Sequence, residues 1–152
     1  RSTSNPVTST WTTTSTMTQF RTSSMFDDIK EFHTKVLQLA PPTDVTMMDM
    51  DFMLERMRFM MEELEEFIEA GHKGDMVGVA DALADVVYVA LGTAWFMNLP
   101  MDQIWQVVHS ANMKKVRGTT KRGNKIDAQK PEGWVGPEQA IAALILRRID
   151  NE

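Results

Sequence analysis

Four glutamates stand within five consecutive residues, in the stretch MEELEEF from Met61 to Phe67. Like charges three or four residues apart on a helix repel each other, so such a density of carboxylates requires an explanation. On a helical wheel Glu63 and Glu66 share a stripe with the aromatic residues Phe52 and Phe59. Glu62 and Glu65, and Glu69 just after this stretch, point further round the helix and can be solvated.

The next apolar segment carries two aspartates, Asp81 and Asp85, which share one face because they are four residues apart. A buried carboxylate must be paired, neutralised or bound to metal. One alternative is an ion pair with a cation from another helix: Arg56, Arg58 or Lys115. The other is that Asp81 and Asp85 face Glu63 and Glu66, so that four carboxylates hold Mg²⁺ or Mn²⁺ through oxygen.

A basic segment follows, because Lys114 to Lys130 contains seven Lys or Arg and one acidic residue, Asp127. It can be a solvated face, an anion-binding arm, or the nucleic-acid-binding arm of a non-enzymatic helical interaction module. The last alternative gives the acidic helices no role. Salt-sensitive binding to duplex DNA without nucleotide turnover would favour it.

A second alternative function is a di-metal carboxylate oxidoreductase built in a helical bundle. Such proteins use pairs of Glu and His three residues apart, and Glu69 with His72 forms one such pair. A second pair is not found on the other predicted helices. We also expect Gly71 to end its helix before His72.

Apolar periodicity predicts five helices and no strand, hence an all-α fold, a helical bundle of about five helices. The predicted helices run from Phe26 to before Pro41, from about Met48 to Ala70, from Asp75 to about Met97, from about Pro100 to Val116, and from Pro137 to Ile149. A long basic loop joins the last two. Residues 1–24 are rich in Ser and Thr and predict a flexible tail, which leaves residues 25–152 as one domain.

The apolar residues of the second predicted helix form one face, which we expect to be core: Met53, Met57, Met60, Met61, Leu64, Phe67 and Ile68. The third helix is apolar on nearly every side, so it should lie inside the bundle or in an oligomer interface. We expect no membrane-spanning run, because Asp81 and Asp85 interrupt this segment. The chain has no cysteine, which excludes disulfides and thiolate-held zinc and fits a reducing cytoplasm.

Three motifs together carry a family resemblance: EELEE, then DALADVVYVALGTA, then VHSANMKKV. The stretch from Phe26 to Trp134 resembles the MazG-like all-α nucleoside triphosphate pyrophosphohydrolases, and is most similar to small phage-encoded members. The resemblance implies metal-dependent cleavage between the α- and β-phosphates, giving a monophosphate and pyrophosphate. It also implies a homo-oligomer, dimer or tetramer, in the host cytoplasm if the protein is phage-encoded, with no membrane and no nucleic-acid partner.

The resemblance assigns roles to the acidic residues. Glu62, Glu63 and Glu66 match the first family motif as catalytic residues, with Glu63 and Glu66 as metal ligands and Glu62 as ligand or base. Asp85 matches the aspartate of the second motif. The family's glutamate three residues earlier is replaced by Ala82, and Asp81 is the expected substitute. The implied cofactor is Mg²⁺, with Mn²⁺ as an alternative and two or more ions per site.

The substrate-binding residues are expected nearer the end of the chain. The resemblance places phosphate contacts on Asn112 and Lys115, and the basic loop adds Lys125 and Lys130 as groups that can close over a triphosphate. For the base we expect contacts from Phe32, His33 and Trp134, with a structural role for each as the alternative. The expected substrate is a deoxynucleotide, and among the purines dGTP or GTP.

Overall fold

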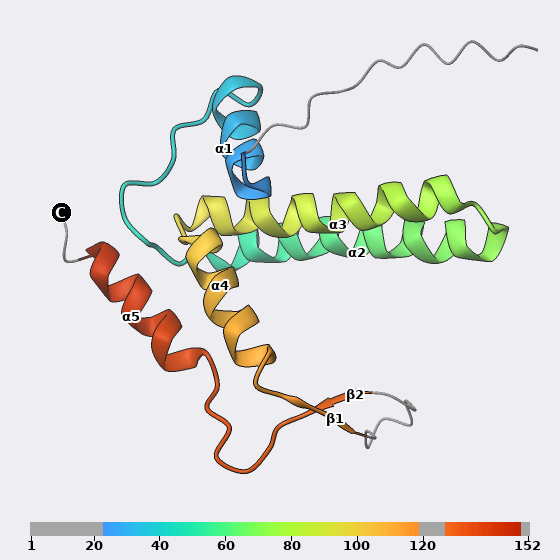
Figure 1. The fold of residues 1–152 in the computed structure, drawn as a ribbon. Coiled ribbons are helices and arrows are strands. Elements are labelled where there is room, and N and C mark those ends of the chain that lie inside the picture. The colour runs from blue at the N-terminus through green and yellow to red at the C-terminus, as the bar shows by residue number, and fades with distance from the viewer. Residues whose placement is uncertain (1–22, 119–126, 150–152) are drawn as a thin grey trace, which may run out of the picture.

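The structure, a computed structural model, describes residues 23–118 and 127–149. Its elements are α1 (Met25–Lys35), α2 (Met50–Lys73), α3 (Met76–Phe96), α4 (Met101–Asn112), β1 (Val116–Gly118), β2 (Asp127–Gln129) and α5 (Glu138–Ile149). The prediction of an all-α fold is confirmed. Figure 1 shows α2 and α3 as a long antiparallel hairpin crossed by α1, whereas α4 and α5 extend away from that hairpin instead of lying along it.

The α2–α3 hairpin is defined by its caps. Asp49 caps the start of α2, because its carboxylate accepts a backbone N–H of the first turn at 2.9 Å. Gly74 ends α2 in the left-handed conformation with φ of 69°, and Asp75 then caps α3. The prediction that α2 ends at Gly71 is wrong, since the helix continues to Lys73. A glycine inside a helix weakens it but does not stop it.

Helix α1 begins with a capping box and is shorter than predicted. The Ser24 hydroxyl accepts the backbone N–H of Asp27 at 3.1 Å, and the Asp27 carboxylate accepts the Ser24 N–H at 3.4 Å. The helix ends at Lys35, before the prolines that were expected to stop it. Val36 and Leu37 were expected on its apolar face, and both lie beyond its end with exposed side chains.

Two short strands form where the sequence predicted only a loop. β1 and β2 pair antiparallel, with Val116 opposite Gln129 and Gly118 opposite Asp127. Three residues are too few for an alternating pattern of polar and apolar residues to be recognised, so this prediction of no strand was wrong. The hairpin brings Lys130 and the segment after it back towards the end of α4.

The buried core lies where α1 packs on the C-terminal part of α3. Phe26 and Ile29 of α1 pack with Ala94 and Trp95 of α3. The apolar face of α2 is not core within one chain, contrary to the prediction. Four of its seven expected core residues are 45–54% exposed: Met57, Met61, Leu64 and Ile68. A core this small leaves much apolar surface to be covered by something else.

Helix α3 shows the same excess of apolar surface. By length and composition it is apolar enough to cross a membrane, so the prediction that no segment qualifies was wrong. Core helices of soluble proteins pass this test when they are buried, but only 11% of its most apolar window is buried inside the chain. Val77, Leu83 and Val87 are among its exposed residues. The expected burial of α3 is therefore not provided by this chain alone.

Candidate active site

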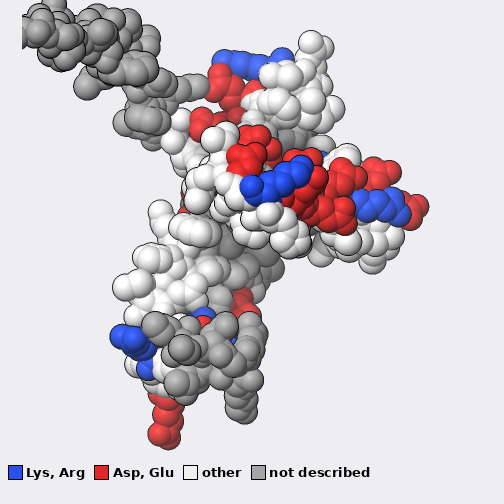
Figure 2. All heavy atoms as spheres, turned by 90° about the vertical axis from the view of Figure 1, so that its right-hand side faces the viewer, with Lys and Arg blue, Asp and Glu red and all other residues white. Residues whose placement is uncertain are grey.

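The carboxylates of α2 and α3 form one electrostatically coupled group, called here the acidic cluster: Glu62, Glu63, Glu66, Asp81 and Asp85. Partial burial raises the pKa of Glu63, and the charges of Asp85, Glu66, Glu62 and Asp81 raise this pKa further. The repulsion therefore acts across the two helices as well as along one of them. Figure 2 shows acidic side chains gathered over the α2–α3 hairpin.

The acidic cluster is more open than the sequence predicted. Asp81 is exposed and Asp85 is half-buried, so the premise of two buried aspartates was wrong. Neither aspartate forms an ion pair with Arg56, Arg58 or Lys115 within the described residues. In the same part of the chain, no three His, Asp or Glu side chains already lie close enough to hold a metal ion.

The donor chemistry of the acidic cluster nevertheless suits hard divalent cations. Its members are all carboxylates from two neighbouring helices, and Mg²⁺ and Mn²⁺ prefer oxygen ligands. Besides partial burial, the charges of neighbouring carboxylates raise the pKa of Glu63, and a bound dication would relieve that repulsion. Metal binding by Glu63, Glu66, Asp81 and Asp85 stays a prediction.

Glu69 and His72, the Glu–His pair on which the oxidoreductase alternative depends, both lie within α2. Because α2 continues to Lys73, His72 is helical and shares a face with Glu69, against the prediction that Gly71 separates them. Glu69 is engaged otherwise, since its carboxylate accepts a hydrogen bond from the Lys73 ammonium at 2.7 Å. No second pair of this kind joins it among the residues that the structure describes.

After α4, the side chains of two lysines lie near the ring of one tryptophan. These three residues are called here the cationic cluster: Lys115, Lys130 and Trp134. The ammonium nitrogens of Lys115 and Lys130 lie 5.4 and 4.6 Å from the centroid of the Trp134 ring. The Trp134 indole N–H donates a hydrogen bond to the Ala111 carbonyl at 2.9 Å, which ties the segment to α4. Asn112 is the exposed last residue of α4.

The two clusters lie apart within one chain. Figure 1 shows α4 and the β1–β2 hairpin extending away from the α2–α3 hairpin, so the segments that carry the cationic cluster lie apart from the helices that carry the acidic one. The expected phosphate contact Lys125 lies outside the described residues. One chain therefore brings together the carboxylates, and separately two of the expected phosphate contacts, without joining the two groups.

The three residues expected to bind the base are not gathered at one place. Phe32 packs edge-on against Tyr88, with ring centroids 5.5 Å apart. His33 is 4% exposed, and its Nδ1 donates to the Ile29 carbonyl at 2.9 Å. Burial lowers the pKa of His33, which favours the neutral form of the ring. Trp134 belongs to the cationic cluster, with lysines near its ring.

The structure adds one residue whose role the sequence did not reveal, Arg56. Its Nε donates to the Thr93 hydroxyl at 3.1 Å, and its Nη2 donates to the Val89 carbonyl at 3.0 Å. The guanidinium carbon lies 5.3 Å from the ring centroid of Phe59 and 5.5 Å from that of Phe96. Arg56 was considered only as an ion-pair partner for an aspartate, since sequence shows no side-chain direction across helices.

A glycine of α3 makes room for this arginine. A Cβ placed on Gly92 would lie 3.1 Å from Cε1 of His33 and 3.3 Å from Nη2 of Arg56. Both distances are tighter than ordinary van der Waals contact, so a larger residue would displace one of the two side chains. The YVALGTA stretch thus forms a cradle in which α1 and α2 place polar groups against α3.

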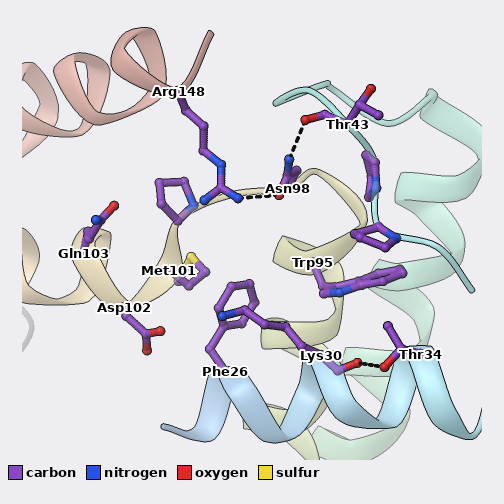
Figure 3. Close-up of a pocket in the computed structure, with 13 residues that line it drawn as sticks. Phe26, Lys30, Thr34, Thr43, Trp95, Asn98, Met101, Asp102, Gln103 and Arg148 are labelled. Atoms are coloured by element: carbon purple, nitrogen blue, oxygen red, sulfur yellow. Dashed lines mark hydrogen bonds between the residues drawn. The ribbon is translucent and has the colours of Figure 1, made fainter. Parts of the chain in front are cut away.

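A cavity lies at the C-terminal end of α3, away from the acidic cluster. It has a volume of about 510 Å³ and lies between α1, the start of α4 and Arg148 of α5. Figure 3 shows Arg148 pointing to Asn98, whose Oδ1 accepts its Nη2 at 3.0 Å. The Asn98 amide in turn donates to the Thr43 carbonyl at 3.0 Å. None of the predicted site residues lines this cavity.

Comparison with known proteins adds one finding to this geometry. The family model described as phosphoribosyl-ATP pyrophosphohydrolase matches residues 29–112, which is more than half of the chain. The match runs from within α1 to the end of α4, so it includes the whole acidic cluster and excludes the cationic one. No curated protein matches the chain significantly. The chain thus belongs to the phosphoribosyl-ATP pyrophosphohydrolase family, among the MazG-like all-α pyrophosphohydrolases, and is a pyrophosphohydrolase for a nucleotide-like substrate.

Proposed function

We propose that the protein hydrolyses a nucleoside triphosphate between its α- and β-phosphates, with dGTP or GTP as the substrate. The observation that supports this most is the acidic cluster. Partial burial and the charges of the neighbouring carboxylates together raise the pKa of Glu63, and these residues lie in the part of the chain that matches the family. Such repulsion is tolerable where the cluster binds a cation during function.

Glu63, Glu66, Asp81 and Asp85 would hold Mg²⁺ or Mn²⁺, two or more ions per site, with Glu62 as a further ligand or as a base. A divalent cation bound here would supply charge neutralisation for the phosphate oxygens and lower the pKa of a water molecule. Asp81 is exposed, and its side chain is shorter than the family's glutamate at residue 82, so it suits an ion at the edge of the cluster.

In the proposed reaction the oxygen of a water molecule bonds to the α-phosphorus, and the bond to the bridging oxygen breaks. One proton of the water is passed to a carboxylate of the acidic cluster, for which Glu62 is the candidate. Pyrophosphate leaves with the electron pair of the broken bond. Lys115 and Lys130 are suited to bind this anion, because their ammonium groups are already gathered beside Trp134.

The separation of the two clusters leads us to propose that the working form is a homo-oligomer, a dimer or tetramer. The exposed apolar side chains of α2 and α3 supply a surface for self-association. A second copy can also bring its cationic cluster to the acidic cluster of the first. Asp81 and Asp85 in the middle of α3 make a membrane a poor alternative cover for that helix.

The test is pyrophosphate release from each common ribonucleoside and deoxynucleoside triphosphate, with Mg²⁺ or Mn²⁺ and with EDTA as the control. We expect release that requires the metal and is fastest with guanine nucleotides. The single product pair should be a monophosphate and pyrophosphate. Release of inorganic phosphate, or no metal-dependent release from any triphosphate, would overturn the proposal.

A further inference from the structure

Arg56 is a half-buried cation without an anionic partner among the residues that the structure describes. It forms no ion pair within residues 23–118 and 127–149, where the recorded ion pairs involve Lys30, Lys35 and Lys73. Burial lowers the pKa of its guanidinium, although arginine stays charged at neutral pH. Keeping an unpaired charge partly out of water costs free energy. Binding a ligand that accepts hydrogen bonds from the guanidinium would offset this cost.

The Arg56 guanidinium is held by two hydrogen bonds and still has N–H groups available for a ligand. Thr93 and Val89 take one N–H each from Nε and Nη2, and Phe59 and Phe96 lie near the guanidinium. A guanidinium has five N–H donors in a planar fork. Three of them have no recorded partner in the described part of the chain. A fork fixed by packing loses little entropy when it binds a second pair of acceptors.

The position of Arg56 relative to the acidic cluster suggests which part of a ligand it meets. Arg56 lies seven residues before Glu63 on α2, which is about 10 Å along the helix axis. Phe59, with 46% of its surface exposed, lies between them in sequence. A nucleotide with its phosphates at the acidic cluster can lay its sugar along this stretch and its base towards Arg56.

We propose that Arg56 is a specificity-determining residue that donates two hydrogen bonds to paired acceptors on the edge of the substrate base. This inference rests on the proposed function. Guanine offers such a pair in O6 and N7, whereas adenine carries an amino donor beside N7. A guanidinium therefore favours guanine over adenine. Phe59 can pack against the same base, because its ring is exposed beside Arg56.

The experiment compares kcat/KM for dGTP and dATP in the full-length wild type and in Arg56→Met. We expect the dGTP to dATP ratio to fall by about five- to a hundredfold, the range for one bidentate contact to guanine. The dATP rate should change little. Arg58→Met is the matched control, because Arg58 is exposed on the same helix and should leave the ratio unchanged.

A structural role for Arg56 gives a different result. The rates for dGTP and dATP would then fall in parallel with the melting temperature, and the ratio would be retained. Arg56→Lys is a second variant that is less prone to misfold, since it keeps the positive charge and the aromatic contacts. It loses the planar pair of N–H donors that a guanidinium provides. We expect this variant also to lose the dGTP preference. A retained preference in a folded Arg56→Lys would overturn the inference.

Thr93→Val tests the positioning of the guanidinium, because it removes the hydroxyl that accepts the Arg56 Nε. A smaller loss of the dGTP to dATP ratio than in Arg56→Met is expected, and no loss would contradict the geometry. The outcomes also separate this inference from the proposed function. A wild type that hydrolyses dGTP and dATP equally well overturns the inference and the guanine preference but leaves the proposed cleavage between the α- and β-phosphates standing, whereas one that hydrolyses neither overturns that reaction.

Discussion

The acidic cluster and the cationic cluster differ in how complete each is within one chain. The contacts of the cationic cluster are all formed within one chain. The Trp134 indole N–H donates a hydrogen bond to the Ala111 carbonyl, and two lysines lie near the Trp134 ring. In the acidic cluster, partial burial and the charges of neighbouring carboxylates both raise the pKa of Glu63, and exposed apolar side chains occur on both of its helices. The family match covers the acidic cluster and ends just before the cationic one.

This difference favours the acidic cluster, not the cationic one, as the proposed metal site. A repelling set of carboxylates is unfavourable for the free protein, and a bound cation would relieve that cost. The cationic cluster satisfies its own contacts and can be carried as an arm to another chain. Variants that change one cluster and leave the other intact test whether the two clusters have different roles.

The largest effect is expected from the acidic cluster. Glu66→Gln or Asp85→Asn should lower hydrolysis more than about a hundredfold, because even residues behind metal ligands cost about ten- to a hundredfold when removed. Steady-state pyrophosphate release with Mg²⁺ measures this loss. Glu65→Gln is the control, since Glu65 lies on the same helix outside the cluster and should retain full activity.

The cationic cluster should give a smaller loss. Lys115→Ala removes one charged hydrogen-bond donor to phosphate, which corresponds to about 1.5–3 kcal/mol, or about ten- to a hundredfold in kcat/KM. Lys35→Ala removes an exposed lysine paired with Glu31 and should change kcat/KM little. Equal losses in the two variants would mean that Lys115 acts only through overall charge.

A mixing experiment asks whether the two clusters meet between chains. Glu66→Gln and Lys115→Ala protein, each weakly active alone, are mixed and allowed to exchange subunits. If each site takes carboxylates from one copy and lysines from another, about a quarter of wild-type activity should return in a two-fold dimer. Size-exclusion chromatography with light scattering gives the oligomeric state. A monomer, or a mixture no better than its parts, would confine the site to one chain.

The smallest effect is on stability and its pH dependence. The fold raises the pKa of Glu63, so the folded state holds its proton to higher pH than the unfolded chain does. Metal-free wild type should therefore lose stability as pH rises from the unfolded pKa, about 4.3, through the raised pKa. Glu63→Gln lacks this loss and should be more stable above that window by about 0.5 kcal/mol.

Thermal unfolding with EDTA at a series of pH values measures this difference between wild type and Glu63→Gln. Mg²⁺ should reverse the order above the window, because it stabilises the wild type more than the variant. Identical pH profiles for the two proteins would show that the carboxylates do not interact in the folded state. Glu65→Gln again serves as the control and should follow the wild type.

The helices could be predicted from sequence because their signals are local. Asp75 lies at the start of α3 as expected, and the apolar period located all five helices to within a few residues. The end of α2 was misplaced at Gly71, because two glycines, Gly71 and Gly74, can each end a helix. Only the left-handed backbone of Gly74 shows which one does.

Burial and side-chain direction could not be predicted in the same way. An apolar period marks the face of α2 that avoids water, but Met57 and Ile68 on that face are exposed within one chain. Periodicity does not distinguish a core from a surface that another molecule covers. The contacts of Arg56 with Thr93 and Val89 depend on how α2 and α3 are aligned, which no local pattern records.

The most direct test of the proposed reaction is hydrolysis of dGTP with Mg²⁺ in water enriched in ¹⁸O. The ³¹P spectrum of the products shows which phosphorus has received the oxygen of water. We expect ¹⁸O in the monophosphate and none in the pyrophosphate, since attack is at the α-phosphorus. Label in the pyrophosphate, or in inorganic phosphate, would contradict cleavage by attack at the α-phosphorus.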